Sequence, residues 1–404
     1  MGRRQNEGRA EDMTPAARGG DFHGSFRAAA DAPQPAFFGA SNSGEGFVSY
    51  FDGIFRERCD RRLILKGGPG TGKSRTLYDI ARRASDAGAR IEYYFCSSDP
   101  DSLDGITAIF PDGRTFGAQD ATAPHAEEAS LPGARDEIFD LGAFWNSECL
   151  SAERDEIERL NLEKSRAWSR AFGCLAAAQR LRLTALGMAH TVIDGERFEK
   201  VAARAAGDAR RSAAATEVMS ELPPLPPRRG GAVLRSPHRS LGMKGAVSLD
   251  GIYCGAREIY VISDGILPGI GELFLTSVAD AAVKSGMHCR ISPDPLCPGL
   301  CAAFVTGGVV YTADRADGLP VTGAAVHRVG MRRFIDSSGL RSISGEYARI
   351  SALSDSAVSA ALSAMSDAAR AHFALEDIYS AAMDFDAKEA ASLAAAEEFS
   401  AHYL

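Results

Sequence analysis

Residues 63–74 read Leu-Ile-Leu-Lys-Gly-Gly-Pro-Gly-Thr-Gly-Lys-Ser, an apolar run followed by a glycine-rich segment that ends in Lys-Ser. Its first three residues are apolar and predict a short buried strand. The pattern Gly-x-x-x-x-Gly-Lys-Ser follows this strand directly, and from Ser74 to Ala87 apolar residues recur at helical spacing. A strand, a glycine-rich loop and a helix in this order are typical of the Walker A motif of P-loop NTPases.

Each residue type in this loop suits the binding of phosphate. Glycines let phosphate oxygens approach the backbone, and successive N–H groups then point into one concavity. The following helix adds its positive N-terminal end. Lys73 would reach the β and γ phosphates, and the Ser74 hydroxyl would bind Mg²⁺. We therefore expect ATP and Mg²⁺ as ligands, and as ATP-binding residues Gly67, Gly68, Pro69, Gly70, Thr71, Gly72, Lys73, Ser74 and Arg75.

A magnesium site also needs a carboxylate at the end of a neighbouring strand. Asp120 follows a predicted strand and is the candidate, so that Ser74 and Asp120 form the expected metal site and Lys73 and Asp120 the expected catalytic pair. Asp99 and Asp112 are alternatives to Asp120. No acid directly follows Asp120, which leaves the general base open, with His125 as one possibility.

Apolar patterning predicts an α/β fold around the loop. A strand at 91–96 completes a βαβ unit and implies a parallel sheet with helices on its faces. Further strands are expected at 106–110 and 115–119, whereas residues 134–220 favour long helices. Upstream, residues 47–55 place aromatic and aliphatic side chains at helical spacing and predict an amphipathic helix.

The second half of the chain repeats the first in weakened form. Residues 258–271 follow the same order of strand and Pro-Gly-x-Gly, and a helix comes next. In this alignment Glu272 stands opposite Lys73 and Leu273 opposite Ser74. A carboxylate repels a triphosphate and leucine cannot bind magnesium. The second half is therefore expected to be a degenerate copy with no catalytic site of its own.

A segment with four prolines separates the two halves. The expected organisation is a disordered tail at 1–43, a P-loop NTPase domain with a helical extension at 44–221, a linker at 222–231, and a degenerate second P-loop-like domain with C-terminal helices at 232–404. The expected fold class is thus α/β, a duplicated P-loop NTPase in which each half has a parallel sheet flanked by helices and an added helical segment.

Composition narrows the functional classes. Hydrophobic residues make up 45% and charged residues 24% of the 404 residues, as in soluble globular proteins. A net charge of −8 argues against nucleic acid and anionic membranes as partners. No stretch approaches the roughly 20 apolar residues of a membrane span, and the N-terminus carries no secretory signal. A cytoplasmic location is expected, with the eight cysteines reduced.

Several short motifs accompany the loop. They are Tyr-Tyr-Phe-Cys-Ser-Ser-Asp-Pro-Asp-Ser-Leu-Asp-Gly at 93–105, Thr-Ala-Pro-His at 122–125, Pro-Gly-Ala-Arg-Asp-Glu-Ile at 132–138, Phe-Trp at 144–145 and Met-Asp-Phe at 383–385. With the loop, they resemble a bacterial family of uncharacterised P-loop ATPases with two tandem P-loop halves, over about residues 45–404. In that family an Asp shortly before Thr-Ala-Pro-His follows an apolar strand, which implies Asp120 here. Family members usually keep a second phosphate loop, and this sequence departs from that pattern.

Three functions are compatible with these features. The first is a Mg²⁺-dependent ATPase or ATP-driven switch, in which hydrolysis moves the two halves against each other. The second is a small-molecule kinase, for which the helices between 134 and 220 would supply the lid. The third is an ATP-sensing scaffold that does not hydrolyse ATP. Each would act on a protein or small-molecule partner that the sequence does not identify.

Overall fold

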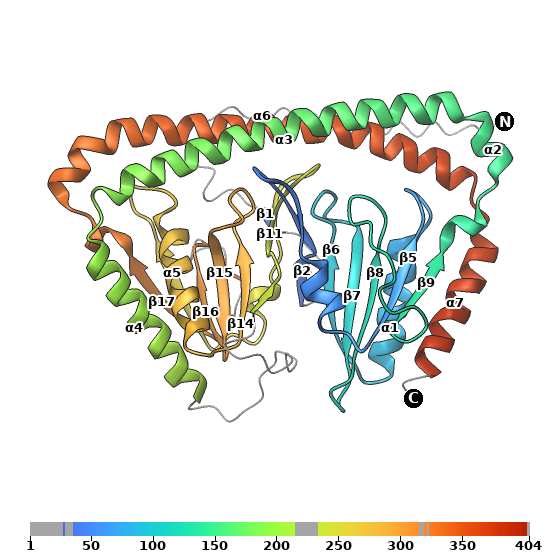
Figure 1. The fold of residues 1–404 in the computed structure, drawn as a ribbon, viewed down its shortest axis with the longest axis horizontal. Coiled ribbons are helices and arrows are strands. Elements are labelled where there is room, and N and C mark those ends of the chain that lie inside the picture. Colours follow the sequence, from blue (N-terminus) through green and yellow to red (C-terminus); the bar gives the residue numbers. More distant parts are fainter. Residues whose placement is uncertain (1–26, 29–34, 215–232, 315–318, 321–322, 402–404) are drawn as a thin grey trace, which may run out of the picture.

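The computed structural model describes residues 27–28, 35–214, 233–314, 319–320 and 323–401. The chain forms two similar α/β halves that lie side by side, with a pair of long helices running above both (Figure 1). The expected linker at 222–231 lies outside the described residues. None of the described helices combines the length and the apolar composition needed to cross a bilayer.

The sheet of the first half has six strands in the order β2-β6-β7-β8-β5-β9. Their bounds are Ala36–Phe38 (β2), Arg90–Phe95 (β6), Leu103–Ile109 (β7), Thr115–Asp120 (β8), Arg61–Lys66 (β5) and Asp136–Asp140 (β9). Strand β5 and helix α1 (Lys73–Asp86) confirm the strand and helix expected around the glycine-rich loop. β5 runs parallel to both of its neighbours, β8 and β9. The loop is therefore carried by an interior strand.

The sheet is mixed, which corrects the expectation of a parallel sheet. β7 runs antiparallel to both β6 and β8. Residues 110–114 alone join β7 to β8, whereas a parallel return needs a crossover of about a dozen residues or more. The short connection, with its Asp-Gly turn, makes this pair of strands a hairpin.

The second half has a sheet of the same construction, and the expected duplication is confirmed. Its strand order, β10-β14-β15-β16-β13-β17, corresponds position by position to that of the first half. The bounds are Val233–Arg235 (β10), Cys289–Pro293 (β14), Cys301–Thr306 (β15), Val309–Thr312 (β16), Glu258–Ser263 (β13) and Ala325–Gly330 (β17). Helix α5 (Ile270–Lys284) follows β13 as α1 follows β5.

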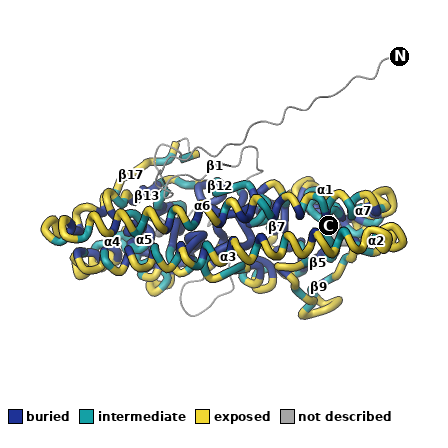
Figure 2. Tube along the Cα trace, turned by 90° about the horizontal axis from the view of Figure 1, so that it is seen from above, coloured by how far each residue is buried: buried dark blue, intermediate teal, exposed yellow. Residues whose placement is uncertain are grey.

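Helices from each half pack against the other half. The bounds are Ser147–Ala152 (α2), Arg154–His190 (α3), Gly195–Ala214 (α4), Ser337–Ala381 (α6) and Phe385–Ala401 (α7). Helices α3 and α6 lie side by side along the molecule, with exposed residues on their outer faces (Figure 2). Helix α4 of the first half packs on α5, where the Phe198 and Phe274 rings meet edge to face at 5.2 Å. Helix α7 of the second half packs on α1, where the Thr76 and Ser392 hydroxyls are 3.3 Å apart.

Short strands and turns complete the fold. The bounds of these strands are Arg27–Ala28 (β1), Ala40–Ser43 (β3), Gly46–Ser49 (β4), Arg239–Gly242 (β11) and Gly245–Ser248 (β12). A π-helix spans Asp52–Arg56, and 3₁₀ turns span Leu141–Phe144, Gly251–Tyr253 and Met331–Phe334. β3 pairs with β4, and β11 with β12. The β12 strand also pairs with β1 from the start of the chain.

Three sequence-based boundaries need correction. The segment 1–43, expected to be a disordered tail, contains β2 and β3, so the first sheet begins before residue 44. The segment 47–55, expected to be an amphipathic helix, contains the end of β4 and most of the π-helix. Its apolar side chains are buried between the two halves, which explains their spacing. The helical region expected from 134 begins with strand β9.

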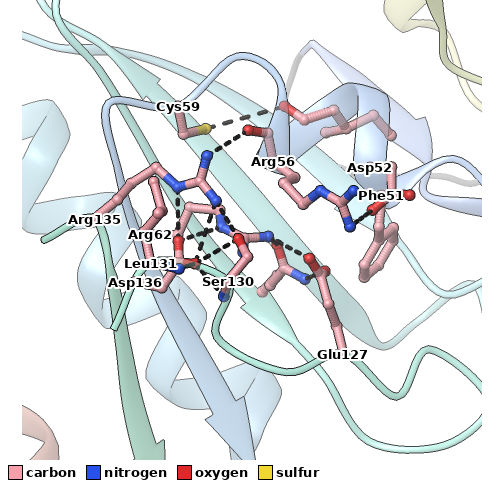
Figure 3. A network of polar contacts seen from close by, with 12 residues as sticks. Phe51, Asp52, Arg56, Cys59, Arg62, Glu127, Ser130, Leu131, Arg135 and Asp136 are labelled. Atoms are coloured by element: carbon pink, nitrogen blue, oxygen red, sulfur yellow. Dashed lines mark hydrogen bonds and ion pairs between the residues drawn. The ribbon is translucent and has the colours of Figure 1, made fainter. Parts of the chain in front are cut away.

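A buried arginine holds the loop-bearing strand in place (Figure 3). Arg62 of β5 is fully buried; its Nε donates to Asp136 Oδ1 at 2.8 Å and its Nη1 to Glu127 Oε1 at 2.6 Å. Arg135 also donates to Asp136. Burial favours the neutral carboxyl of Asp136, but these hydrogen bonds dominate and hold its pKa well below its usual range. The network ties β5 to β9 and to the loop after β8.

Candidate functional site

The glycine-rich loop joins the carboxyl end of β5 to Lys73, the first residue of α1. Gly70 and Gly72 have φ angles of 69° and 80°, a region that glycine enters without strain. At Gly70 a side chain also has no room, because a Cβ there would lie 2.5 Å from the Glu376 carbonyl oxygen. Gly72 is the N-cap residue of α1 and supplies no side-chain cap. The positive end of α1 therefore lies at the loop.

Lys73 and Asp120 meet at this loop. The Lys73 Nζ donates to the carbonyl oxygens of Gly67 at 2.8 Å and Gly68 at 2.7 Å, and it lies 3.5 Å from Asp120 Oδ2. Asp120 is the last residue of β8 and pairs with Leu65 of β5, so strand register brings the carboxylate to the loop. Burial raises the pKa of Asp120; Lys73 lowers it and a nearby Asp104 raises it further, with a net increase.

The oxygen atoms expected to bind magnesium lie at this same edge of the sheet. Ser74 Oγ accepts a hydrogen bond from the N–H of Leu103, the first residue of β7, at 3.0 Å. Thr122 donates from its N–H to Asp120 Oδ1 and from its hydroxyl to the Gly67 carbonyl, both at 2.8 Å. A hydroxyl and a carboxylate are ligands that suit Mg²⁺ beside phosphate. Thr122 thus fixes the carboxylate and the loop to each other.

A second group of ligand-type side chains lies beside Asp120. Cys96, Asp104 and His125 each offer a ligand atom, and these atoms are within 4.8 Å of one another. His125 Nε2 is 3.1 Å from Asp104 Oδ2, and its ring stacks on Phe51 at 4.7 Å. Burial lowers the pKa of His125, but the hydrogen bond and charge of Asp104 outweigh it, and the net change is upward. Asp104 and His125 therefore form a buried pair in which the carboxylate favours the protonated imidazole.

The alternatives to Asp120 lie in different surroundings. Asp112 belongs to the turn before β8, at the opposite end of that strand from Asp120, and forms an ion pair with Arg114 at 2.5 Å. Asp99 lies in the loop after β6 and forms an ion pair with Lys244 at 2.7 Å. Of these acids, Asp120 is the one paired with Lys73. Arg75 is exposed on α1, where it pairs with Asp79 at 3.4 Å.

Helices of the second half lie directly on the loop. The Ser380 hydroxyl, at the end of α6, donates to the Gly70 carbonyl at 3.1 Å. Tyr379 packs against Trp145 with 5.4 Å between ring centroids, and a Cβ at Gly68 would lie 3.2 Å from the Trp145 ring. The glycine-rich loop is therefore in contact with residues from both halves.

The second half lacks the corresponding residues. The buried face of α5 sets its register against α1: Phe274, Leu275, Val278, Ala279 and Ala282 correspond to Thr76, Leu77, Ile80, Ala81 and Ala84. This register places Gly271 opposite Lys73 and Glu272 opposite Ser74. The sequence alignment, in which Glu272 stands opposite Lys73, is thus displaced by about one position. It followed the shared Pro-Gly, which does not occupy equivalent places in the two loops.

Carboxylates fill the second loop. Asp264 accepts hydrogen bonds from the N–H groups of Gly269, at 2.6 Å, and of Gly271. Arg182, from α3 of the first half, lies 3.2 Å from Asp294 and 3.3 Å from Glu272. Burial, with the charge of Glu272, raises the pKa of Asp264 to about 7. The N–H groups of the second loop therefore bind a carboxylate of the same chain, whereas the first loop has Lys73.

No family model, curated protein or solved structure matches this chain in comparisons with known proteins.

Two contributions to the site were not predicted from the sequence. Asp104 lies within the quoted segment 93–105 and belongs to β7, and the hairpin of β7 and β8 brings it to Asp120. The covering residues on α6 and α7 come from more than 300 positions away, as the contact between Ser380 and Gly70 shows. Local sequence pattern carries no signal for a contact at that separation.

Proposed function

We propose that this chain binds ATP with Mg²⁺ at the loop from Gly67 to Ser74 and acts as an ATPase or an ATP-driven switch. The observation that carries the proposal is the position of Asp120. It ends the strand next to β5 and lies 3.5 Å from Lys73, beside a glycine-rich loop at the positive end of α1. A lysine, a helix N-terminus and a carboxylate for the metal are the parts that triphosphate binding requires.

The contact between the loop and α6 supports a switch. Ser380 of α6 donates to the Gly70 carbonyl at 3.1 Å, and α6 continues from there along α3 to the other half. A change in loop conformation on hydrolysis would therefore displace a helix that both halves share. Nucleotide-dependent ordering of segments that contact the γ-phosphate is a common mechanism of switching.

Phosphate release from ATP by the purified full-length chain tests the proposal. The matched variants are Lys73→Ala and Lys200→Ala, since Lys200 is an exposed lysine whose one ion pair within the described part of the chain is with Glu196 on α4. We expect Mg²⁺-dependent release by the native chain and by the Lys200 variant, and none by the Lys73 variant. ADP formation that requires added metabolites and releases no phosphate would instead identify a small-molecule kinase. ATP binding without turnover under any of these conditions would identify a sensor.

A further inference from the structure

Lys388 is a buried lysine beside the phosphate loop of the other half. It lies in the first turn of α7 and is only 4% exposed. Its ammonium is so close to Gly72 that a Cβ there would lie 3.2 Å from Nζ. Among the described residues, none forms a hydrogen bond or an ion pair with this ammonium. A buried charge is normally paired, so this lysine requires an explanation.

Charges of both signs surround Lys388, but none of them pairs with its ammonium among the described residues. Lys73 and the N-terminus of α1 lie at the same loop, and the first turn of α1 contains no acidic residue. Burial has the largest effect and lowers the pKa of Lys388; the charge of Arg75 acts in the same direction, and the charges of Asp79 and Glu389 oppose both without reversing the change. Two lysines and a helix N-terminus together form a site for an anion of high charge.

In the second half, carboxylates of the chain itself neutralise the positive groups at the corresponding loop. There the first turn of α5 contains Glu272, and Asp264 accepts hydrogen bonds from the loop N–H groups. The cation that the other half contributes, Arg182, is paired with Glu272 and Asp294. In the first half the contributed cation, Lys388, has no such partner among the described residues.

We propose that Lys388 binds the phosphates of the nucleotide, so that the phosphate site is composite and is completed by a helix of the degenerate half. The inference rests on the proposed function and deepens it. Helix α7 reaches the first half because α6 carries the chain across the molecule (Figure 1). The second half is then required for nucleotide binding even though its own loop binds none, since it supplies one of the cations that neutralise the triphosphate.

Affinities of three variants for Mg²⁺–ATP and for tripolyphosphate, measured by calorimetry on the full chain, test the inference. Lys388→Met keeps the apolar stem and removes the charge, Lys388→Arg keeps the charge, and Lys200→Met is the exposed control. Loss of one charge-assisted contact should weaken both ligands about ten- to a hundred-fold in Lys388→Met. The arginine variant should retain most of the affinity, and the control all of it.

Tripolyphosphate separates a phosphate contact from a contact to the base, and stability separates binding from folding. Because Lys388→Met removes an unpaired buried charge, its melting temperature without ligand should equal or exceed that of the native chain. Native affinity for both ligands in Lys388→Met, with binding lost in Lys73→Ala, would refute the inference and leave the proposed function intact. Absence of binding by the native chain would refute both.

Discussion

Replacing Arg182 with methionine tests the buried charge cluster of the second half. Arg182 is 5% exposed; its Nη1 lies 3.2 Å from each carboxylate oxygen of Asp294 and its Nη2 lies 3.3 Å from Glu272. At an effective dielectric constant of about 20, each opposite pair at about 4 Å contributes roughly 4 kcal/mol. Removing the guanidinium also removes its own desolvation cost. The net loss expected for breaking a buried pair from one side is about 3–5 kcal/mol.

The assay is urea unfolding of the full chain, with Arg170→Met as the matched control. Arg170 lies on the same helix and pairs with Asp367 of α6 at 3.1 Å, but the two side chains are 58% and 40% exposed. An exposed pair of this kind contributes about 0–1 kcal/mol. A loss for Arg182→Met within about 1 kcal/mol of the control would show that the cluster does not stabilise the fold as inferred.

The pH dependence of that loss provides a second check. The pKa of Asp264 is raised from 3.8 to about 7, so the folded chain retains a proton that the unfolded chain releases in this range. This group therefore makes the native chain less stable as the pH rises from about 4 to about 7. Without Arg182 the remaining carboxylates repel one another when ionised. The free energy of unfolding lost in Arg182→Met, relative to the native chain, should accordingly be larger at pH 8 than at pH 5.

Three further substitutions test the metal site, a buried ion pair between the halves and the contact between the loop and α6. Asp120→Asn should weaken ATP binding in Mg²⁺ much more than in EDTA, because metal coordination is its proposed role; equal losses would exclude that role. Glu92, whose Oε1 lies 2.6 Å from Arg290 of the other half, has a pKa lowered to about 2 because Arg290 and Arg58 outweigh burial. The ionised Glu92 contributes about 3 kcal/mol to the free energy of unfolding at pH values above 4.5, its pKa in the unfolded chain, and this contribution is lost as the pH falls to about 2. The free energy of unfolding should therefore fall less between pH 5 and pH 3 in Glu92→Gln than in the native chain. Gly70→Ala should destabilise the chain more than Gly46→Ala, since both glycines have positive φ but a Cβ meets Glu376 only at Gly70; equal effects in thermal melting would contradict the contact with α6.

Local signals in the sequence were sufficient for the central elements. The apolar run in β5, the glycine-rich loop and the helical spacing of α1 are all encoded within residues 61–86. The position of Asp120 also follows from strand periodicity, although β8 contains Gly117, Ala118 and Gln119. Small and polar residues are accommodated there because β5 and β7 flank β8 on both sides.

Features that depend on distant segments were not accessible in this way. The apolar residues at 47–55 fit a helix or an interface between two sheets equally well, and only the second half decides between them. The exchange of α4 and α7 between halves is likewise unmarked, since an apolar helical face does not specify which sheet it covers. Lys388 and Arg182 reach their loops through this exchange. Lysine is rare here, with seven in the chain, and that rarity is the one local hint at Lys388.

The stoichiometry of Mg²⁺–ATP binding to the full chain distinguishes one functional nucleotide site from two. The first half has Lys73 and Asp120 at its loop, whereas the second has Asp264 and Glu272. Calorimetry at saturating ATP should therefore give one nucleotide per chain, and Lys73→Ala should abolish binding completely. Two nucleotides per chain, or one that persists in Lys73→Ala, would contradict the assignment of a single functional site to the first half.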